Sequence, residues 1–456
     1  MAATTEQFRE VTDANGRTYR IGETPETLTG RSRGYMIWLP WLAMAAISAF
    51  EYAYGSAEST LEQTYHWSST EAFWITSVWA FFQAGIAFPA GRLREKGTFS
   101  ARAAVLTGAV LCLVAYLAIA NTGNLLAVMA LYSVLGGVGA GIIYATCINM
   151  VGKWYPEKRG ARTGFVNGGF AYGAVPLIYV FNYHFGPGNY RLVLTLVGFY
   201  MLLVLGVCGW FFKDPPKNWW PAEVDPLRRG ADNPSARRSL EKNPPAVHQF
   251  TPAEALRTGV LPLMWLALVI TSGISLFGIN FQVKFAKASD FGPLVTASSM
   301  GILSIVNGVG RGFVGWVSDR TGRRQALVGV CVILGLAQFG VAYAGRSHNE
   351  VLFLAFAFLS GFGGGAFYPM FAALVPDYFG ENYNATNYGF VYSGKLVGAL
   401  FGGGIGAAYI NSYGYLNAYV LAGVIGLVSA LVVLLLHQPR RGYAPEPEPT
   451  VAPRAA

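Results

Sequence analysis

The sequence carries the same pattern of glycines and charged residues twice, about 224 positions apart. The paired segments lie at three places: residues 91–102 and 315–324, residues 164–174 and 389–399, and Tyr144 and Tyr368. A near-constant interval at three separate places implies two halves of one ancestral unit. In an apolar chain, two such halves are typical of a transporter whose site lies between them.

The composition places the chain in a membrane. Of its 456 residues, 53% are hydrophobic and only 12% are charged, whereas a soluble domain carries roughly a quarter charged residues. Apolar runs long enough to cross a bilayer recur along the chain. They predict twelve spans, at residues 35–57, 71–91, 103–121, 125–151, 163–184, 192–212, 259–283, 293–316, 325–345, 351–374, 386–409 and 415–437.

The net charge of +9 could suggest a nucleic-acid partner, but the positions of the cations argue against one. Of the 33 Lys and Arg residues, 27 fall in the N-terminal segment, the loops on the same predicted side and the C-terminal segment. Only four fall on the opposite side. This asymmetry predicts that both termini lie in the cytoplasm, so we expect the lipid bilayer, and no nucleic acid, as the chain's surroundings.

The predicted fold is an all-α membrane protein with twelve transmembrane helices in two pseudo-symmetric six-helix halves. We expect a cytoplasmic arm at 1–30, the first half at 31–212, a cytoplasmic linker at 213–257, the second half at 258–437 and a disordered cytoplasmic tail at 438–456. Thr251 followed by Pro252 is a good helix start, which predicts a short amphipathic helix in the linker.

The first pair of repeated segments predicts cytoplasmic gating loops. Their candidate residues are Glu95, Arg102, Asp319, Arg320 and Arg323. Each acid is expected at the start of the next helix, and the cations are expected to pair with acids and helix ends of neighbours. The alternative is an ordinary loop that is basic only because it faces the cytoplasm.

Three charged residues fall well inside predicted spans: Glu51, Arg311 and Lys395. A charge at the middle of a membrane costs on the order of 2.5–3.5 kcal/mol on the insertion scale, so few are retained without a use. They come from both halves, and we expect them to meet at a central site. The alternative is a structural set of ion pairs, Glu51 with Arg311 or Lys395, that holds the halves together.

Arg311 is the first candidate for substrate, because a guanidinium matches a carboxylate with two parallel hydrogen bonds. Lys395 adds a second cation, and two cations against one acid favour an anionic substrate. Asn307 lies one helical turn before Arg311 and could bind substrate or orient Arg311. Tyr144 and Tyr52 are further candidates. Each of these three uncharged residues could instead only pack; Tyr368, Tyr392 and Asn149 are weaker candidates.

No motif predicts a metal, a cofactor or catalysis. The four cysteines all lie within predicted helices and form no CxxC pair, and there is no Cys/His cluster. A membrane sensor that binds an anion without carrying it is a remote alternative, but no signalling domain is visible in the linker or tail.

The repeated loop at 315–324 closely resembles the loop signature of the major facilitator superfamily, which implies a two-lobed carrier that alternates access by rocking. Residues 307–319, 387–408 and 154–160 are similar to segments of the oxalate:formate antiporter family. The resemblance implies that Arg311 and Lys395 bind a carboxylate, and that Tyr144 and Tyr52 match tyrosines of that family.

Two departures from that family bear on the substrate. Glu51 stands where the oxalate carrier has a neutral amide, and Gly361 and Gly365 stand where it has aromatic residues. The glycines are expected to widen the pocket. Glu51 is expected to favour fewer negative charges on the substrate, or to couple transport to a proton. The spacing of Asn307 and Arg311 also resembles the proton-coupled monocarboxylate transporters.

The sequence therefore predicts a secondary active transporter in the plasma or inner membrane. It is expected to act as a monomer on a small carboxylate anion, most simply a short monocarboxylate such as lactate, pyruvate or formate, with protons moving alongside. Oxalate:formate exchange without net proton movement is the alternative.

Overall fold

The computed structural model describes residues 8–12, 17–224, 226 and 234–439. Of these, eleven helical segments are long and apolar enough to cross a bilayer. A two-stranded antiparallel hairpin, β1 (Arg9–Thr12) and β2 (Thr18–Ile21), precedes them, with Arg9 opposite Ile21. The predicted tail falls almost wholly outside the described residues.

The first half follows a short helix, α1 (Pro25–Thr29). Its elements are α2 (Tyr35–Ile47), η1 (Ala49–Ala53), α3 (Tyr54–Tyr65), α4 (Ser69–Gly85), α5 (Ala87–Glu95), α6 (Ala101–Asn121), α7 (Leu125–Val128), η2 (Met129–Leu135), α8 (Gly136–Trp154), η3 (Pro156–Lys158), α9 (Arg159–Tyr172), α10 (Val175–Tyr183) and α11 (Tyr190–Trp210).

The linker contains α12 (Pro234–Lys242) and α13 (Pro252–Arg257). The elements of the second half are α14 (Val260–Ala288), α15 (Pro293–Thr321), α16 (Arg323–Arg346), α17 (Glu350–Phe379), α18 (Asn384–Tyr392), α19 (Gly394–Leu400), η4 (Phe401–Ile405) and α20 (Gly406–Leu434).

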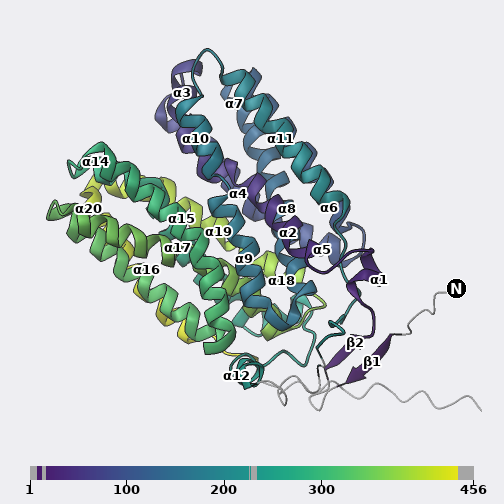
Figure 1. The fold of residues 1–456 in the computed structure, drawn as a ribbon. Helices are drawn as coiled ribbons and strands as arrows, with labels where there is room; N and C mark the ends of the chain where they lie inside the picture. Colours follow the sequence, from purple (N-terminus) through teal and green to yellow (C-terminus); the bar gives the residue numbers. More distant parts are fainter. Residues whose placement is uncertain (1–7, 13–16, 225, 227–233, 440–456) are drawn as a thin grey trace, which may run out of the picture.

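The two halves form two helical bundles (Figure 1). The purple-to-teal helices of the first half and the green-to-yellow helices of the second approach each other at the end where the hairpin and α12 lie. We call this the linker end. The bundles diverge towards the opposite end, where α3 and α14 lie. The halves meet mainly where α9 packs on α15 and where α5 packs on α18.

Two glycines in the first pair of repeated segments let these helices touch backbone to backbone. A Cβ at Gly315 would lie 2.2 Å from the carbonyl oxygen of Gly160, and a Cβ at Gly91 would lie 2.2 Å from that of Ala385. Any larger residue would push the helices apart. The internal repeat therefore supplies the same close crossing twice, once for each pair of helices.

The last helical segment is 51 residues long, Asn384–Leu434. A single straight helix of that length would measure about 75 Å, far more than the roughly 30 Å of a bilayer's hydrocarbon core. The backbone leaves helical geometry at Gly414, where φ is 81° and ψ is 164°. The segment therefore consists of two helices, and its break follows the predicted span at 386–409 and precedes the one at 415–437.

The hairpin and the linker are joined to each other at the linker end. The backbone N–H of Arg20 donates to Asn218 at 2.8 Å, and that of Trp220 donates to Arg20 at 2.9 Å. Trp219 is buried and its ring contacts Trp154 at the end of α8. The arm and the linker therefore form one layer across this end.

The linker also contacts the second half. Asn243 accepts from the backbone N–H of Arg323 at 2.7 Å, and donates to the carbonyl of Ser318 at 3.1 Å. The predicted helix after Thr251 is confirmed as α13, with a reciprocal cap between Thr251 and Glu254. The backbone hydrogen bond from Thr251 holds the pKa of Glu254 below its ordinary value, as expected for a carboxylate at a helix start.

Candidate substrate site between the halves

Arg311 lies at the junction of the two halves, and its hydrogen-bond acceptors in the described part of the chain are uncharged. Its side chain is 1% exposed. It donates to Asn307 Oδ1 one turn earlier on α15, at 3.2 Å and 2.7 Å, and to the hydroxyl of Tyr52 at 3.0 Å. It also donates to the backbone carbonyl of Asn167 at 3.1 Å and contacts that residue's amide oxygen. These neutral partners fix the guanidinium's position and leave its charge uncancelled.

Lys395 is held differently, because its partner is an acid from the other half. Its ammonium lies 2.6 Å from Glu51 Oε2 and 3.4 Å from Gln83 Oε1. Lys395 is 1% exposed and the Glu51 side chain 10% exposed. The geometry thus supports the prediction that Glu51, Arg311 and Lys395 meet. Glu51 contacts Lys395, and the adjacent Tyr52 contacts Arg311.

The ring of Tyr368 connects the two cations. The guanidinium carbon of Arg311 lies 5.2 Å from its centroid, and the ammonium of Lys395 lies 5.8 Å from it. Both are within cation–π range. Lys395 also lies 5.6 Å from the ring of Phe170. A small anion beside Tyr368 would therefore be close to both positive charges.

Tyr144 and Tyr392 form the aromatic wall of the site. Their rings stack with centroids 4.6 Å apart, and the ring of Phe170 meets Tyr144 edge-on at 5.3 Å. The Tyr144 hydroxyl accepts a hydrogen bond from Asn167 Nδ2 at 2.8 Å. Tyr144 therefore stands one hydrogen bond away from Arg311, through Asn167.

Two amides that were not predicted complete the site. Asn167 links Arg311 to Tyr144, and Gln83 donates to Tyr392 at 2.9 Å while accepting from Lys395. Both are fully buried. Each had a signal in the sequence: Gln83 is the one amide in its predicted span, and Asn167 occupies the repeat position of Tyr392.

Glycines on α8 bring Gln83 and Tyr144 together. A Cβ at Gly137 would lie 2.6 Å from the carbonyl oxygen of Trp79, and one at Gly141 would lie 2.2 Å from that of Gln83. Small residues of this kind let membrane helices approach closely. The glycines at the start of α8 therefore allow α4 to pack closely against the helix that carries Tyr144.

The expectation that Gly361 and Gly365 widen the pocket is wrong. A Cβ at Gly365 would lie 2.2 Å from the carbonyl oxygen of Asn307, and one at Gly361 would lie 2.4 Å from that of Leu303. Both glycines press α17 against α15 and leave no added space. Their effect is to position the helix that carries Asn307 and Arg311.

The repeated acids close the linker end, in a way that differs from the prediction. Neither acid caps the next helix; α6, for example, is capped by Ser100. Asp319 instead accepts from the backbone N–H groups of Gly160 and Ala161, at 3.1 Å and 2.9 Å. Glu95 accepts from the backbone N–H of Thr386 at 2.9 Å. Each acid thus lies at the start of a helix in the opposite half, where the helix dipole favours it.

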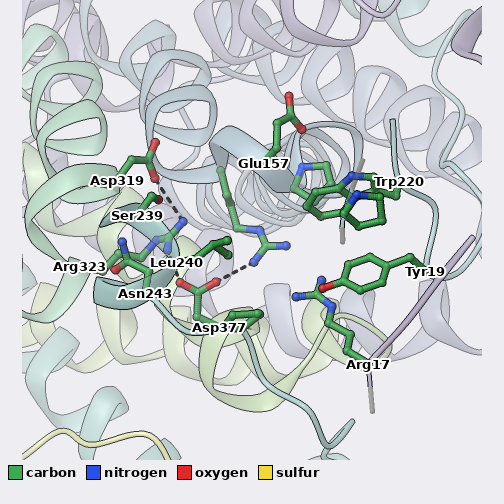
Figure 2. Close-up of a pocket in the computed structure, with 14 residues that line it drawn as sticks. Arg17, Tyr19, Glu157, Trp220, Ser239, Leu240, Asn243, Asp319, Arg323 and Asp377 are labelled. Carbon is green, nitrogen blue, oxygen red and sulfur yellow. Dashed lines mark hydrogen bonds and ion pairs between the residues drawn. The ribbon is translucent and has the colours of Figure 1, made fainter. Parts of the chain in front are cut away.

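A buried cluster of ion pairs surrounds the Asp319 contact (Figure 2). Asp377 accepts from Arg159 of the first half at 3.0 Å and also contacts Arg323. Glu381 contacts Arg159 and lies 3.6 Å from Arg17 of the arm. The arm thereby contributes directly to the closure, and a cavity of about 250 Å³ beside it is lined by the hairpin, the linker and α5.

Of the remaining gate candidates, Arg323 belongs to the ion-pair cluster. The other two lie outside it: Arg102 packs over Trp210, and Arg320 packs over Trp316 of its own helix. Asn149 accepts from Arg94, which also pairs with Asp214 of the linker at 2.6 Å.

Asp214 anchors the start of the linker. Burial alone would raise its pKa, but Arg94 and Lys153 outweigh burial and hold the pKa below its ordinary value. This contact is therefore present at neutral pH and is lost only as the pH falls through that lowered pKa.

No group of three or more His, Cys, Asp or Glu side chains able to hold an ion occurs in the described part of the chain. All four cysteines are buried and free.

The sequence model of the Major Facilitator Superfamily matches residues 40–390 and 347–455. The chain belongs to this superfamily. The oxalate:formate antiporter of Oxalobacter formigenes is 24% identical over 423 residues, covering 91% of this chain and 95% of that protein. The 4-hydroxybenzoate transporter PcaK of Pseudomonas putida is 31% identical over 147 residues, covering 32% of this chain and 31% of that protein.

Solved structures of the superfamily share the fold. The transporter FucP, in an outward conformation, matches with a TM-score of 0.64 at 16% identity, covering 88% of this chain and 98% of that one. The proton:xylose symporter XylE matches with a TM-score of 0.69 at 12% identity, covering 89% and 96%. This superfamily member is therefore a multi-pass protein of the cell membrane, and its relatives are transporters rather than enzymes.

Proposed function

We propose that this chain is a secondary active transporter of short monocarboxylates, such as lactate, pyruvate or formate, with proton coupling. The single observation that carries the proposal is the setting of Arg311. Its guanidinium is buried between the halves, and the partners that the structure gives it are uncharged: Asn307, Asn167 and Tyr52. A buried cation fixed in this way favours a carboxylate of the substrate as its counter-charge.

Lys395 and Glu51 set the number of charges on that substrate. Because Glu51 already offsets one cation, the three groups leave one net positive charge. While Glu51 is ionised, one carboxylate balances this charge, whereas two would leave an excess negative charge in a low-dielectric site. We therefore assign Lys395 an assisting role in binding and Glu51 the coupling proton, with Asn307, Tyr144 and Tyr52 around the substrate.

The proposal also includes the number of membrane crossings and their orientation. We infer twelve crossings, because the break at Gly414 divides the last segment into two helices that are each long enough to span. The excess of cations at the linker end favours the cytoplasm for that side and for both termini. The contacts at the linker end then close the cytoplasmic side, and alternating access requires them to break. Transport by this route needs no second copy of the chain.

Oxalate:formate exchange is the second candidate. It is favoured by the likeness to the antiporter of Oxalobacter formigenes along almost the whole chain, and by the presence of two buried cations at one site. The two candidates differ in measurable ways, because symport moves a proton with the anion whereas exchange requires a substrate on the far side.

Uptake by the purified protein in proteoliposomes tests the proposal. Labelled lactate, formate and oxalate would each be offered with and without an inward proton gradient. We expect the gradient to stimulate lactate or formate uptake into vesicles that contain no substrate. Oxalate uptake that requires internal formate and ignores the gradient would establish the exchanger instead. Binding without movement of any label would identify a sensor.

A further inference from the structure

We propose that Arg31 and Arg102 form a binding site for the phosphate of an anionic phospholipid, at the point where α11 reaches the membrane surface of the linker end. The occupant is a lipid such as phosphatidylglycerol, whose headgroup has one phosphodiester and no cation. This inference does not depend on which substrate the carrier moves. Its consequence is that the lipid composition of the leaflet at the linker end affects how firmly the arm is held.

Two guanidiniums lie on consecutive rings at the end of α11. The guanidinium carbon of Arg102, in the first turn of α6, lies 5.1 Å from the centroid of the Trp210 ring. That of Arg31, which follows α1, lies 4.1 Å from the centroid of the Phe211 ring. Arg31 also lies 5.1 Å from the ring of Tyr35 at the start of α2. The segment between α1 and α2 and the start of α6 thus each supply one cation beside the end of α11.

The rings place these cations at the level of lipid headgroups. Trp210 is 59% exposed and Tyr35 is 44% exposed. Both lie at ends of segments that are long and apolar enough to cross a bilayer, and Arg102 is the second residue of a third such segment. Exposed tryptophan and tyrosine gather at the boundary between hydrocarbon and water. A lipid headgroup is therefore the anion whose position matches that of these guanidiniums.

In the described part of the chain, the structure gives neither Arg31 nor Arg102 a carboxylate partner. Arg33, two residues after Arg31, contacts Glu157 instead. The C-terminal end of α11 carries only about half a negative charge, which offsets only part of two guanidinium charges. A guanidinium matches a phosphate with parallel hydrogen bonds, and basic pockets between membrane helices bind anionic headgroups. The unbalanced charge therefore favours an anion from outside the chain.

Two other arginine–aromatic contacts at helix ends differ from this site. Arg320 lies over Trp316 and donates to the carbonyl of that residue at 3.2 Å. Arg191 lies over Tyr190 and donates to its hydroxyl at 3.0 Å. Each is a contact between neighbours in one helix. The site at α11 instead joins cations from two segments that are far apart in the sequence, as a shared anion requires.

A lipid at this site would hold the arm against the first half. Arg31 follows α1, and the carbonyl of Leu28 in α1 accepts a hydrogen bond at 2.6 Å from Lys213, just after α11. The hairpin of the same arm is joined to the linker through the backbone of Arg20. A ligand that binds only the docked arm stabilises the docked state by mass action. We therefore expect phosphatidylglycerol to slow local opening of the hairpin.

Native mass spectrometry of the purified full-length protein measures lipid binding directly. Phosphatidylglycerol and phosphatidylcholine would each be titrated into wild type, Arg31→Gln, Arg102→Gln and the double variant. A cation near the membrane surface raises the affinity for anionic lipid about fivefold. We therefore expect each single variant to bind phosphatidylglycerol about fivefold more weakly, and the double variant about 25-fold more weakly. Binding of phosphatidylcholine should change by less than about twofold.

The matched control is the double variant Arg191→Gln with Arg320→Gln, which removes the same total charge from two arginine–aromatic contacts outside the site. Its affinity for phosphatidylglycerol should stay within about twofold of wild type. If the glutamine variants are not monodisperse, Arg31→Lys with Arg102→Lys decides, because this variant keeps both charges. Affinity within about fivefold of wild type supports the site, and a larger loss contradicts it.

Hydrogen exchange in nanodiscs tests the effect on the arm. Phosphatidylglycerol in place of phosphatidylcholine should slow exchange of the β2 amides at least about threefold in wild type, and should not slow it in Arg31→Gln. Equal slowing in the two proteins would contradict the effect on the arm. Equal affinity of wild type and the Arg31→Gln/Arg102→Gln variant for phosphatidylglycerol would show that the site is wrong. Displacement of the lipid by an excess of inorganic phosphate would also contradict the proposal, because the site would then bind free phosphate.

Discussion

At the scale of single residues, the two buried cations are held by different kinds of partner. Arg311 is surrounded by amide, carbonyl and hydroxyl oxygens, which hold its plane in position. Lys395 is a compact point charge that shares one carboxylate with the opposite half. We therefore expect the guanidinium to be the fixed element of the site, and the ammonium to be the cation whose partner changes.

Replacing Arg311 with Lys tests whether geometry or charge matters more. The ammonium keeps the positive charge but cannot make the planar set of contacts to Asn307, Asn167 and Tyr52. We expect lactate uptake to fall at least about 100-fold, equivalent to roughly 2.7 kcal/mol of binding and transition-state interaction. Initial rates would be normalised to the amount of monodisperse protein in the vesicles.

Arg320→Lys is the matched control, since Arg320 packs over Trp316 away from the site. Its uptake should stay near the wild-type rate. Uptake by Arg311→Lys within a few fold of wild type would mean that a positive charge alone is enough, and that the hydrogen bonds only maintain the fold.

The buried polar residues of the site differ in how far the sequence predicts them. Charges inside apolar spans are costly, so Glu51, Arg311 and Lys395 could be predicted and their meeting could be anticipated. Gln83 and Asn167 carried a weaker signal and were missed, because a buried amide often serves only to pair with a neighbouring backbone group. Which atoms pair depends on helix rotation, and the hydropathy of a span does not specify rotation.

At the scale of elements, the repeated glycines and acids act together. The sequence predicted the halves, but it assigned the acids to the wrong partners, because a loop's nearest helix in sequence is not its nearest helix in space. Gly91 and Gly315 bring helices of opposite halves into backbone contact. Glu95 and Asp319 then reach helix starts across the junction. The wrong expectation for Gly361 and Gly365 has the same cause, because their nearest neighbours lie on α15 rather than in the pocket.

A methyl group at Gly315 should prevent the linker end from closing. In Gly315→Ala, the new Cβ would lie 2.2 Å from the carbonyl oxygen of Gly160, so α15 and α9 must separate. We expect uptake to fall at least tenfold. A cysteine introduced near Ala161 should react faster with a water-soluble maleimide, because the linker end stays open.

Gly206→Ala provides the control for this change. It adds the same methyl group to α11 at a position where no atom lies within 4 Å. Uptake and labelling should both match wild type. Equal labelling of Gly315→Ala and wild type would contradict the view that the closed state depends on this crossing.

At the scale of the whole molecule, the arm and linker stabilise one conformation of the two halves. The hairpin is joined to the linker by backbone hydrogen bonds, and the linker contacts both halves. Arg17 of the arm and Arg159 of the first half both contact Glu381 of the second. Under the proposed alternating access, we expect these contacts to be lost on each transport cycle.

Glu381→Gln should therefore shift the carrier towards the state that is open at the linker end. The loss leaves Arg159 paired with Asp377, so we expect a change of one to two kcal/mol, or about 5–30-fold in the ratio of the two states. Spin-label distances between the halves at the linker end would report that ratio. Glu241→Gln, which removes an exposed pair with Arg237 on α12, should change the ratio by less than about twofold. If the two variants give the same distance distribution, the Glu381 contacts do not hold the closed state, and closure depends on the helix crossings and the two repeated acids alone.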